Sequence, residues 1–190
     1  MRYGLALALA VCCCAYVRGA TVNPGANLIQ GAVANAAVGE TITLNPGVHI
    51  ITGGININKQ VILKGTAGGV NNTFIDKHNT TSQDVAAIFI GEGVNGVRLE
   101  NFTLRGRNVG GPGIVVLSNS NVFTDVRVFN CGVDNSTGRR SNIVFDGSHL
   151  NTFNRCWSNN STWVGFSQWA SSDNVFNSCV ADNNGAEGLT

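Results

Sequence analysis

One short pattern returns four times in the second half of the chain. It occupies residues 97–104, 122–128, 152–158 and 175–181, with anchors at Leu99, Phe123, Phe153 and Phe176. The steps between successive anchors are 24, 30 and 23 residues. A repeat with a period in the twenties is typical of a solenoid, in which each repeat forms one coil stacked on the last.

A second family of short apolar segments precedes the anchors. Its members are 87–90, 113–117, 142–145 and 164–166. Only 12% of the residues are charged, and Val, Ile, Phe and Thr are frequent, which favours β-strands over helices. The sequence therefore predicts an all-β fold, a single-stranded parallel β-helix in which each repeat forms one coil.

The first nineteen residues are expected to lie outside this domain. Arg2 is followed by an almost wholly apolar run from Leu5 to Val17. This run is typical of a secretory signal peptide and is shorter than the ~20 residues that a membrane span needs, so an uncleaved signal anchor is the weaker alternative. We predict a signal peptide at 1–19, a β-helix domain at 20–190, and a secreted, extracellular protein without a further membrane span.

The charge balance argues against a nucleic-acid partner. Removal of 1–19 takes away two arginines and leaves ten basic and eleven acidic side chains, a net charge of −1. No basic patch remains to neutralise a phosphate backbone.

Both ends of the predicted domain have distinctive patterns. Apolar residues recur at helical spacing between Asn27 and Ala37, which predicts a short helix capping the first coil. At the other end, 185–190 resembles the opening of a further coil, comparable to 164–166. We therefore expect a C-terminal continuation or a partner that covers the open end.

Two structural columns follow from the register of the repeats. The anchor rings are expected to stack inside the coils, and an asparagine follows four residues after each of Val126, Cys156 and Cys179. Stacked amides at a bend can satisfy one another and nearby backbone groups. The predicted ladder residues are Phe123, Phe153, Phe176, Asn130, Asn160 and Asn183.

Three cysteines remain after the predicted signal peptide. Cys156 and Cys179 occupy equivalent places on neighbouring coils, where a strand spacing of ~4.8 Å is within the range of Cα separations found in disulfides. A disulfide and a pair of stacked thiols that act as small core residues are equally compatible with this spacing. Cys131 has no partner of this kind.

The chain contains six Asn-x-Ser/Thr sequons. In a eukaryotic secretory pathway several of them could carry glycans, whereas structural asparagines produce many sequons by chance. The candidate asparagines are Asn71, Asn79, Asn101, Asn135, Asn159 and Asn160.

Two regions of the chain resemble a known superfamily. The start helix, the segments 39–44 and 45–49 and the strand 61–65 resemble the N-terminal region of pectin-lyase-like proteins, and the later Gly-Ile-x-Val and Asn-x-Phe-x-x-Val/Cys repeats resemble right-handed β-helix repeats. The resemblance implies a right-handed, three-sided helix. It also implies binding, cleavage or epimerisation of acidic polysaccharides.

If the chain resembles the lyases, a groove lies on the outer face beside the anchor strands. A lyase needs a base that removes the C5 proton of a uronate and cations that neutralise its carboxylate. Asp125, Arg127 and Arg155 are the candidate catalytic residues, and Glu100 with Asp125 could supply oxygens to calcium. The alternative is that Asp125 and Arg155, on adjacent coils, form a surface ion pair.

The three tryptophans are candidates for carbohydrate binding. Trp157 falls in an outward column with Thr103, Arg127 and Val180, whereas Trp163 and Trp169 lie in loops flanking a strand. Exposed indole rings bury apolar area against a sugar while leaving polar edges wet. They could instead cover the side of the coil or pack under loops.

The favoured interpretation is a secreted, carbohydrate-interacting β-helix protein that acts on acidic polysaccharide, lyase-like or epimerase-like if it is enzymatic, with calcium as the candidate cofactor. The alternative is a non-catalytic extracellular surface or adhesion scaffold. A cluster of three or more carboxylates, or of arginines with carboxylates, in one groove would favour the enzyme.

Overall fold

The structure is a computed structural model that describes residues 19–78, 85–107, 110–132 and 141–190. The predicted signal peptide lies outside the described residues, apart from Gly19. No helix among the described residues is long and apolar enough to cross a membrane. The elements are β1 (Ala20–Val22), β2 (Gly25–Ala26), α1 (Leu28–Asn35), β3 (Thr41–Leu44), β4 (Gly47–Ile51), β5 (Ile55–Ile57), β6 (Ile62–Gly65), the 3-10 helix η1 (Gly69–Asn71), β7 (Thr73–Lys77), β8 (Ile88–Ile90), β9 (Arg98–Arg105), β10 (Ile114–Val116), β11 (Val122–Phe129), β12 (Ile143–Asp146), β13 (Thr152–Asn154), β14 (Trp157–Asn159), β15 (Phe166–Trp169), β16 (Val175–Asn177) and β17 (Val180–Asp182).

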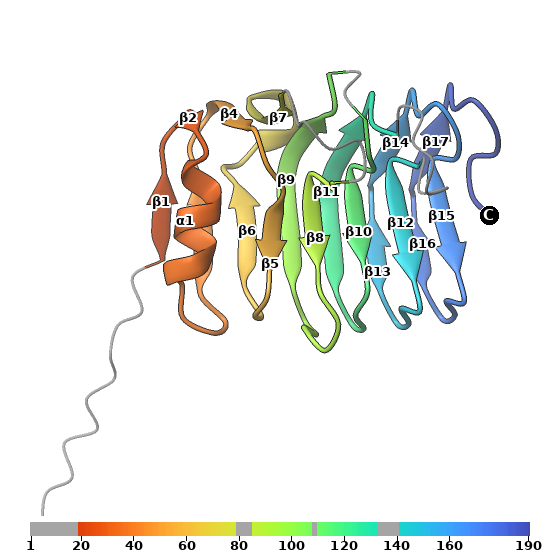
Figure 1. Cartoon of the computed structure of the whole chain (residues 1–190), viewed down its shortest axis with the longest axis horizontal. Helices are drawn as coiled ribbons and strands as arrows, with labels where there is room; N and C mark the ends of the chain where they lie inside the picture. Colours follow the sequence, from red (N-terminus) through yellow and green to blue (C-terminus); the bar gives the residue numbers. More distant parts are fainter. Residues whose placement is uncertain (1–18, 79–84, 108–109, 133–140) are drawn as a thin grey trace, which may run out of the picture.

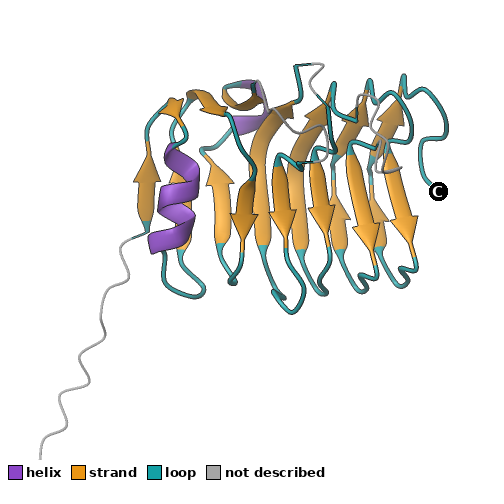
Figure 2. Ribbon diagram, viewed as in Figure 1, coloured by secondary structure: helices purple, strands orange, loops and turns teal. Residues whose placement is uncertain are grey.

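The strands form two sheets in which every paired strand is parallel to its neighbour. The larger sheet has the order β1-β3-β6-β9-β11-β13-β16, with β2, β4, β7, β14 and β17 attached beside this path, and the smaller one has the order β15-β12-β10-β8-β5. Figures 1 and 2 show successive coils stacked side by side along the long axis. The predicted all-β parallel solenoid with one short helix is confirmed.

The anchor residues lie in one inward column. Phe123 aligns with Leu99 on one side and with Phe153 on the other, and Phe153 aligns with Phe176. The ring centroids of Phe123 and Phe153 are 4.2 Å apart, and those of Phe153 and Phe176 are 5.1 Å apart, both stacked. The second family is also in register, since Ile88, Ile114, Ile143 and Phe166 align across the smaller sheet.

Each coil turns at residues in the left-handed backbone conformation. In the later coils such residues recur at three positions: three residues before the anchor, two residues after it and seven residues after it. Where these positions carry a side chain, φ lies between 50° and 58°. Asparagine and aspartate adopt this conformation more readily than other residues with a side chain, and they occupy six of the ten aligned non-glycine positions. The aligned non-glycine positions are Ser120, Leu150 and Asp173; Asn101, Asp125, Arg155 and Ser178; and Asn130, Asn160 and Asn183.

The last of these sets corrects the predicted amide ladder. Asn160 and Asn183 have exposed side chains, and Asn130 is only partly buried. The backbone N–H of Asn130 donates to the carbonyl of Asn159 at 3.4 Å. The regular spacing of these asparagines reflects a demand for left-handed turn residues, and they are not the buried hydrogen-bonding column that we expected.

The buried amide ladder lies two residues before each anchor. Asn121 and Asn151 are both fully buried. The Asn151 side-chain oxygen accepts from the backbone N–H and the amide of Asn121, both at 2.9 Å, and Asn151 donates to the Asn174 side-chain oxygen at 3.0 Å. The Asn121 side-chain oxygen in turn accepts from the backbone N–H of Val97 at 2.9 Å. These bonds satisfy polar groups that would otherwise be buried without partners.

The helix α1 lies at the N-terminal end of the stack, as predicted (Figure 1). Ile29 and Val33 are buried against the first coils. The Gln30 side chain accepts from the backbone N–H of Asn56 at 2.7 Å, so it occupies the place of a neighbouring strand beside β5. Lys59 donates to the carbonyls of Ala34 and Ala36, near the end of the helix. The edge of the smaller sheet is thereby covered.

The segment 185–190 begins a further coil, as predicted. Leu189 forms a parallel bridge with Phe166, and the Phe166 N–H donates to the carbonyl of Gly188 at 2.9 Å. The expected continuation or partner at this end stays a prediction.

Candidate functional site

The outer face of the larger sheet carries the predicted outward column. Arg127 on β11 aligns with Thr103 on one side and with Trp157 on the other, and Trp157 aligns with Val180. The alternation of strands turns the neighbouring Val128 and its partners inward, which leaves these four side chains on the outer side of the sheet. Thr103 is buried there, because its hydroxyl donates to the carbonyl of Val70 in η1. Trp157 is 38% exposed.

A second outward column lies two residues further along the same strands. Arg105, Phe129, Asn159 and Asp182 align across β9, β11, β14 and β17. We did not single out this column, although counting six residues from each anchor finds it in the sequence. The two columns together place arginines, aromatic rings and acceptor oxygens on one face.

The two columns enclose a hollow at the C-terminal half of this face. It has a volume of about 380 Å³ and is lined by Arg127, Trp157, Asn159, Val180 and Asp182; we call it the Trp157 hollow. The guanidinium carbon of Arg127 lies 4.0 Å from the centroid of the Trp157 ring, a cation–π contact.

The polar groups of the hollow have both signs of charge. Partial burial lowers the pKa of Arg127 below its usual value, and the carboxylate of Asp182 acts in the opposite direction. The guanidinium remains a cation at every physiological pH. The Asn159 side-chain oxygen is buried and has no hydrogen-bond partner among the described residues, so it offers an acceptor to a ligand hydroxyl.

Asp125 and Arg155 lie together, but they form an ion pair in which both carboxylate oxygens of Asp125 are occupied. Both residues have the left-handed backbone conformation, with φ of 52° and 51°, and they lie at equivalent turns of adjacent coils. Arg155 donates from Nε to Asp125 Oδ1 at 2.8 Å and from its terminal nitrogen to Oδ2 at 2.6 Å. The hydrogen bond to Asp125 raises the pKa of Arg155. Arg127 instead stacks on Trp157, so the three candidate catalytic residues do not form one cluster of free groups.

Glu100 has an arginine partner of its own. Arg98 lies 2.6 Å from Glu100 Oε1. Glu100 aligns with Thr124 and not with Asp125, so the two carboxylates proposed for calcium occupy different positions along their coils. Within the described ranges, no group of three or more His, Cys, Asp and Glu residues could hold a metal ion. Calcium binding stays a prediction.

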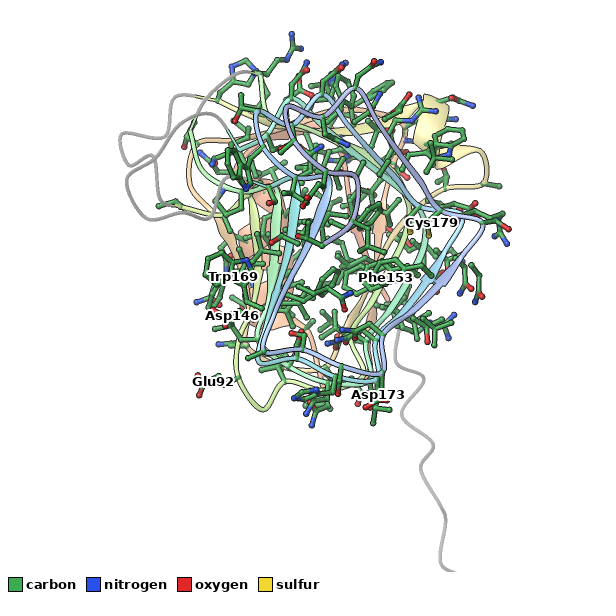
Figure 3. The ribbon with its side chains drawn as sticks, turned by 90° about the vertical axis from the view of Figure 1, so that its right-hand side faces the viewer. Glu92, Asp146, Phe153, Trp169, Asp173 and Cys179 are labelled. Atoms are coloured by element: carbon green, nitrogen blue, oxygen red, sulfur yellow. The ribbon has the colours of Figure 1, made fainter. Side chains whose placement is uncertain are left out.

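The other two tryptophans do not line the Trp157 hollow. Trp169 ends β15 in the smaller sheet, aligns with Asp146 and donates from its indole to Ser167 Oγ at 2.7 Å. Figure 3 shows Trp169 and Asp146 together on one side of the coil, opposite Cys179. Trp163 lies between β14 and β15 and is 49% exposed.

A buried charge cluster further along the same face was not expected from the sequence. Asp76 is fully buried in β7 and accepts hydrogen bonds from Arg105 and Arg107. The guanidinium of Arg105 also lies 4.2 Å from the centroid of the Phe74 ring. The face thus repeats an arginine–aromatic contact, first at Phe74 and again at Trp157.

The sequons differ in exposure. Asn71 and Asn160 are exposed, whereas Asn101 and Asn159 are partly buried. Asn79 and Asn135 lie outside the described residues. Glycosylation stays a prediction at all six positions.

Comparisons with known proteins address the fold alone. No protein-family model matches the chain, and no curated protein matches it. A solved structure, ORF18 of Geobacillus virus E2, is similar with a TM-score of 0.55 and 15% sequence identity. The similarity covers 92% of this chain and 41% of that protein, so the chain spans about two fifths of its length.

Proposed function

We propose that the chain is a secreted β-helix protein of the pectin-lyase-like type that binds acidic polysaccharide in the Trp157 hollow. The resemblance of the N-terminal segments and of the repeats supports the superfamily, and the apolar run from Leu5 to Val17 supports secretion. The contact of a guanidinium with an indole, beside acceptor oxygens, is the observation that carries the proposal.

Each part of the hollow matches one part of a uronate residue. The indole of Trp157 offers apolar surface to a sugar ring. Arg127 offers a charge-assisted hydrogen bond to the carboxylate. Asn159 and Asp182 offer acceptors to hydroxyl groups, which a neutral apolar pocket would lack.

A non-catalytic binding role is favoured over a lyase or epimerase. Proton removal at C5 needs a base within reach of the sugar. Of the residues predicted for catalysis, Asp125 is paired with Arg155 and Arg127 stacks on Trp157, so none of them is a free base. Among the described residues, no group of three or more His, Cys, Asp and Glu residues could hold a metal ion. Arginines do meet a carboxylate at Asp76, but that carboxylate is fully buried and accepts from Arg105 and Arg107. The alternative of an extracellular adhesion scaffold is compatible with the same glycan contact, since adhesion requires binding alone.

Titration of intrinsic fluorescence tests the binding. Replacement W163F/W169F leaves Trp157 as the single emitter among the described residues, and the titrants are oligosaccharides of polygalacturonate, alginate and hyaluronan, with neutral oligosaccharides as controls. An acidic oligosaccharide should change the Trp157 emission with saturation, and neutral ones should not.

Variants of the hollow identify the groups involved. The variants are compared by calorimetric titration, because W157A removes the fluorescent reporter. W157A should weaken binding about tenfold or more, because stacking and buried apolar area are lost. R127K keeps the charge but loses the planar fork and should weaken binding by up to about tenfold. W169A is the matched control and should bind normally. Equal loss in W169A, or no binding of any acidic oligosaccharide, would exclude this site.

The absorbance of unsaturated product, followed with and without calcium, tests the enzyme. We expect no product from pectate, alginate or hyaluronan. Product formed by the wild type and lost in D125N would establish a lyase in place of a binding protein.

A further inference from the structure

Two thiols lie at the same point of adjacent coils. Cys156 follows the left-handed residue Arg155, and Cys179 follows the left-handed residue Ser178. The flanking strand pairs β13–β16 and β14–β17 are in register, and the Val180 N–H donates to the carbonyl of Cys156 at 2.9 Å. The backbone therefore holds the two side chains over one another.

The two thiols are both free and lie on adjacent coils. The Cys156 thiol donates to the carbonyl of Asn154 and the Cys179 thiol to the carbonyl of Phe153, each at 3.5 Å. Cys156 is fully buried, whereas Cys179 is partly exposed beside the last coil (Figure 3). Among the described residues, Cys179 is thus the more accessible thiol of the two.

The pair differs chemically from the third thiol of the domain. Interaction with the adjacent Cys156 thiol lowers the pKa of Cys179 to about 7, and the same interaction together with burial raises the pKa of Cys156. Cys131 is fully buried, and burial raises its pKa to about 12. Since the thiolate is the nucleophile, Cys179 is the reactive member at neutral pH.

We propose that Cys179 is a thiol-modification site that reacts with low-molecular-weight disulfides and that Cys156 resolves the product into a bridge between the last two coils. This assignment is independent of carbohydrate binding. The accessible position of Cys179 and the adjacent position of Cys156 carry it.

The chemistry is two successive thiol–disulfide exchanges. The Cys179 thiolate attacks one sulfur of the disulfide, a mixed disulfide forms, and one thiolate leaves. In the mixed disulfide Cys179 no longer raises the pKa of Cys156. Cys156 attacks the Cys179 sulfur, which forms the Cys156–Cys179 bond, and its proton passes to the second thiolate as that group leaves. The two protein sulfurs lose two electrons in total, and the small disulfide gains them.

Tryptic digestion separates the relevant cysteines cleanly. Residues 156–190 contain no Lys or Arg, so Cys156 and Cys179 stay in one peptide. Cys131 lies in the peptide 128–139, and the cysteines at 12–14 lie in 3–18. Mass spectrometry of the full chain after treatment with oxidised glutathione can therefore assign each product.

In the wild type, the peptide 156–190 should lose the mass of two hydrogen atoms and retain no glutathione. C156A should instead accumulate one glutathione on Cys179, because the resolving thiol is missing. C179A should leave Cys156 reduced, and C131A should behave as the wild type. Circular dichroism checks that each variant is folded.

A stable glutathione adduct on wild-type Cys179 would overturn the resolving role of Cys156. The order of alkylation by iodoacetamide in the wild type tests the site without any variant. Cys179 should react first, and earlier reaction of Cys131 or Cys156 would refute the assignment.

Discussion

Replacement of Phe153 by alanine tests the stacked interior most severely. The Phe153 ring is fully buried and stacks between Phe123 and Phe176, with centroid distances of 4.2 and 5.1 Å. It also meets Phe145 edge-on at 4.9 Å and Phe166 at 6.2 Å. Removal of a buried phenylalanine costs about 3–5 kcal/mol. Because the coils on both sides keep the cavity from closing, F153A should lower the free energy of unfolding by an amount near the upper end of this range, about 4–5 kcal/mol.

F176A is the matched control for this prediction. Among the described residues the Phe176 ring is stacked on one side only, and it is partly exposed. Its loss should cost about 2 kcal/mol, since less apolar area is buried. Urea unfolding followed by far-ultraviolet circular dichroism measures both variants. If F153A cost no more than F176A, the argument from a two-sided aromatic stack would be wrong.

Three further results are expected. N151A should lower the free energy of unfolding by about 3 kcal/mol in the same assay, because it leaves buried amide groups of the ladder without partners. A similar loss of stability in N160A, at an exposed asparagine, would contradict the assignment of the ladder to Asn121, Asn151 and Asn174. The rate of Cys179 alkylation should rise with pH through a midpoint of about 7, since deprotonation creates the nucleophile, while Cys131 should stay slow because its pKa is about 12; a flat rate profile for Cys179 would be inconsistent with the thiol pair. D125N should leave stability and polysaccharide binding nearly unchanged, because the pair with Arg155 is exposed to solvent, and a loss of binding measured by fluorescence titration would place Asp125 in the site.

Much of the fold was predictable because each coil of a solenoid needs the same kinds of residue at the same positions. Every coil must place an apolar residue over the anchor of the coil below, so the spacing of Leu99, Phe123 and Phe153 predicts how the strands align. The location of the amide ladder was not predicted, because two different requirements select asparagine. Asn130 serves a left-handed turn, whereas Asn121 satisfies buried backbone groups, and spacing alone does not separate the two.

The site was predictable to the extent that it follows the strand alternation. Counting along the strands placed Arg127 and Trp157 on the outer face together. The pairing of Asp125 with Arg155 was weighed from the sequence, but the direction of long side chains depends on rotamers that a register does not fix. Asp76 was missed because an isolated acidic residue in a strand gives no sign of two arginines from the next coil.

A crystal structure of the protein with a bound uronate oligosaccharide tests the central claim most directly. We predict a uronate ring against the indole of Trp157, with its carboxylate in hydrogen-bond contact with Arg127. A sugar seated at Trp169 on the opposite sheet, or an oligosaccharide that binds in solution without contacting Trp157, would contradict the account.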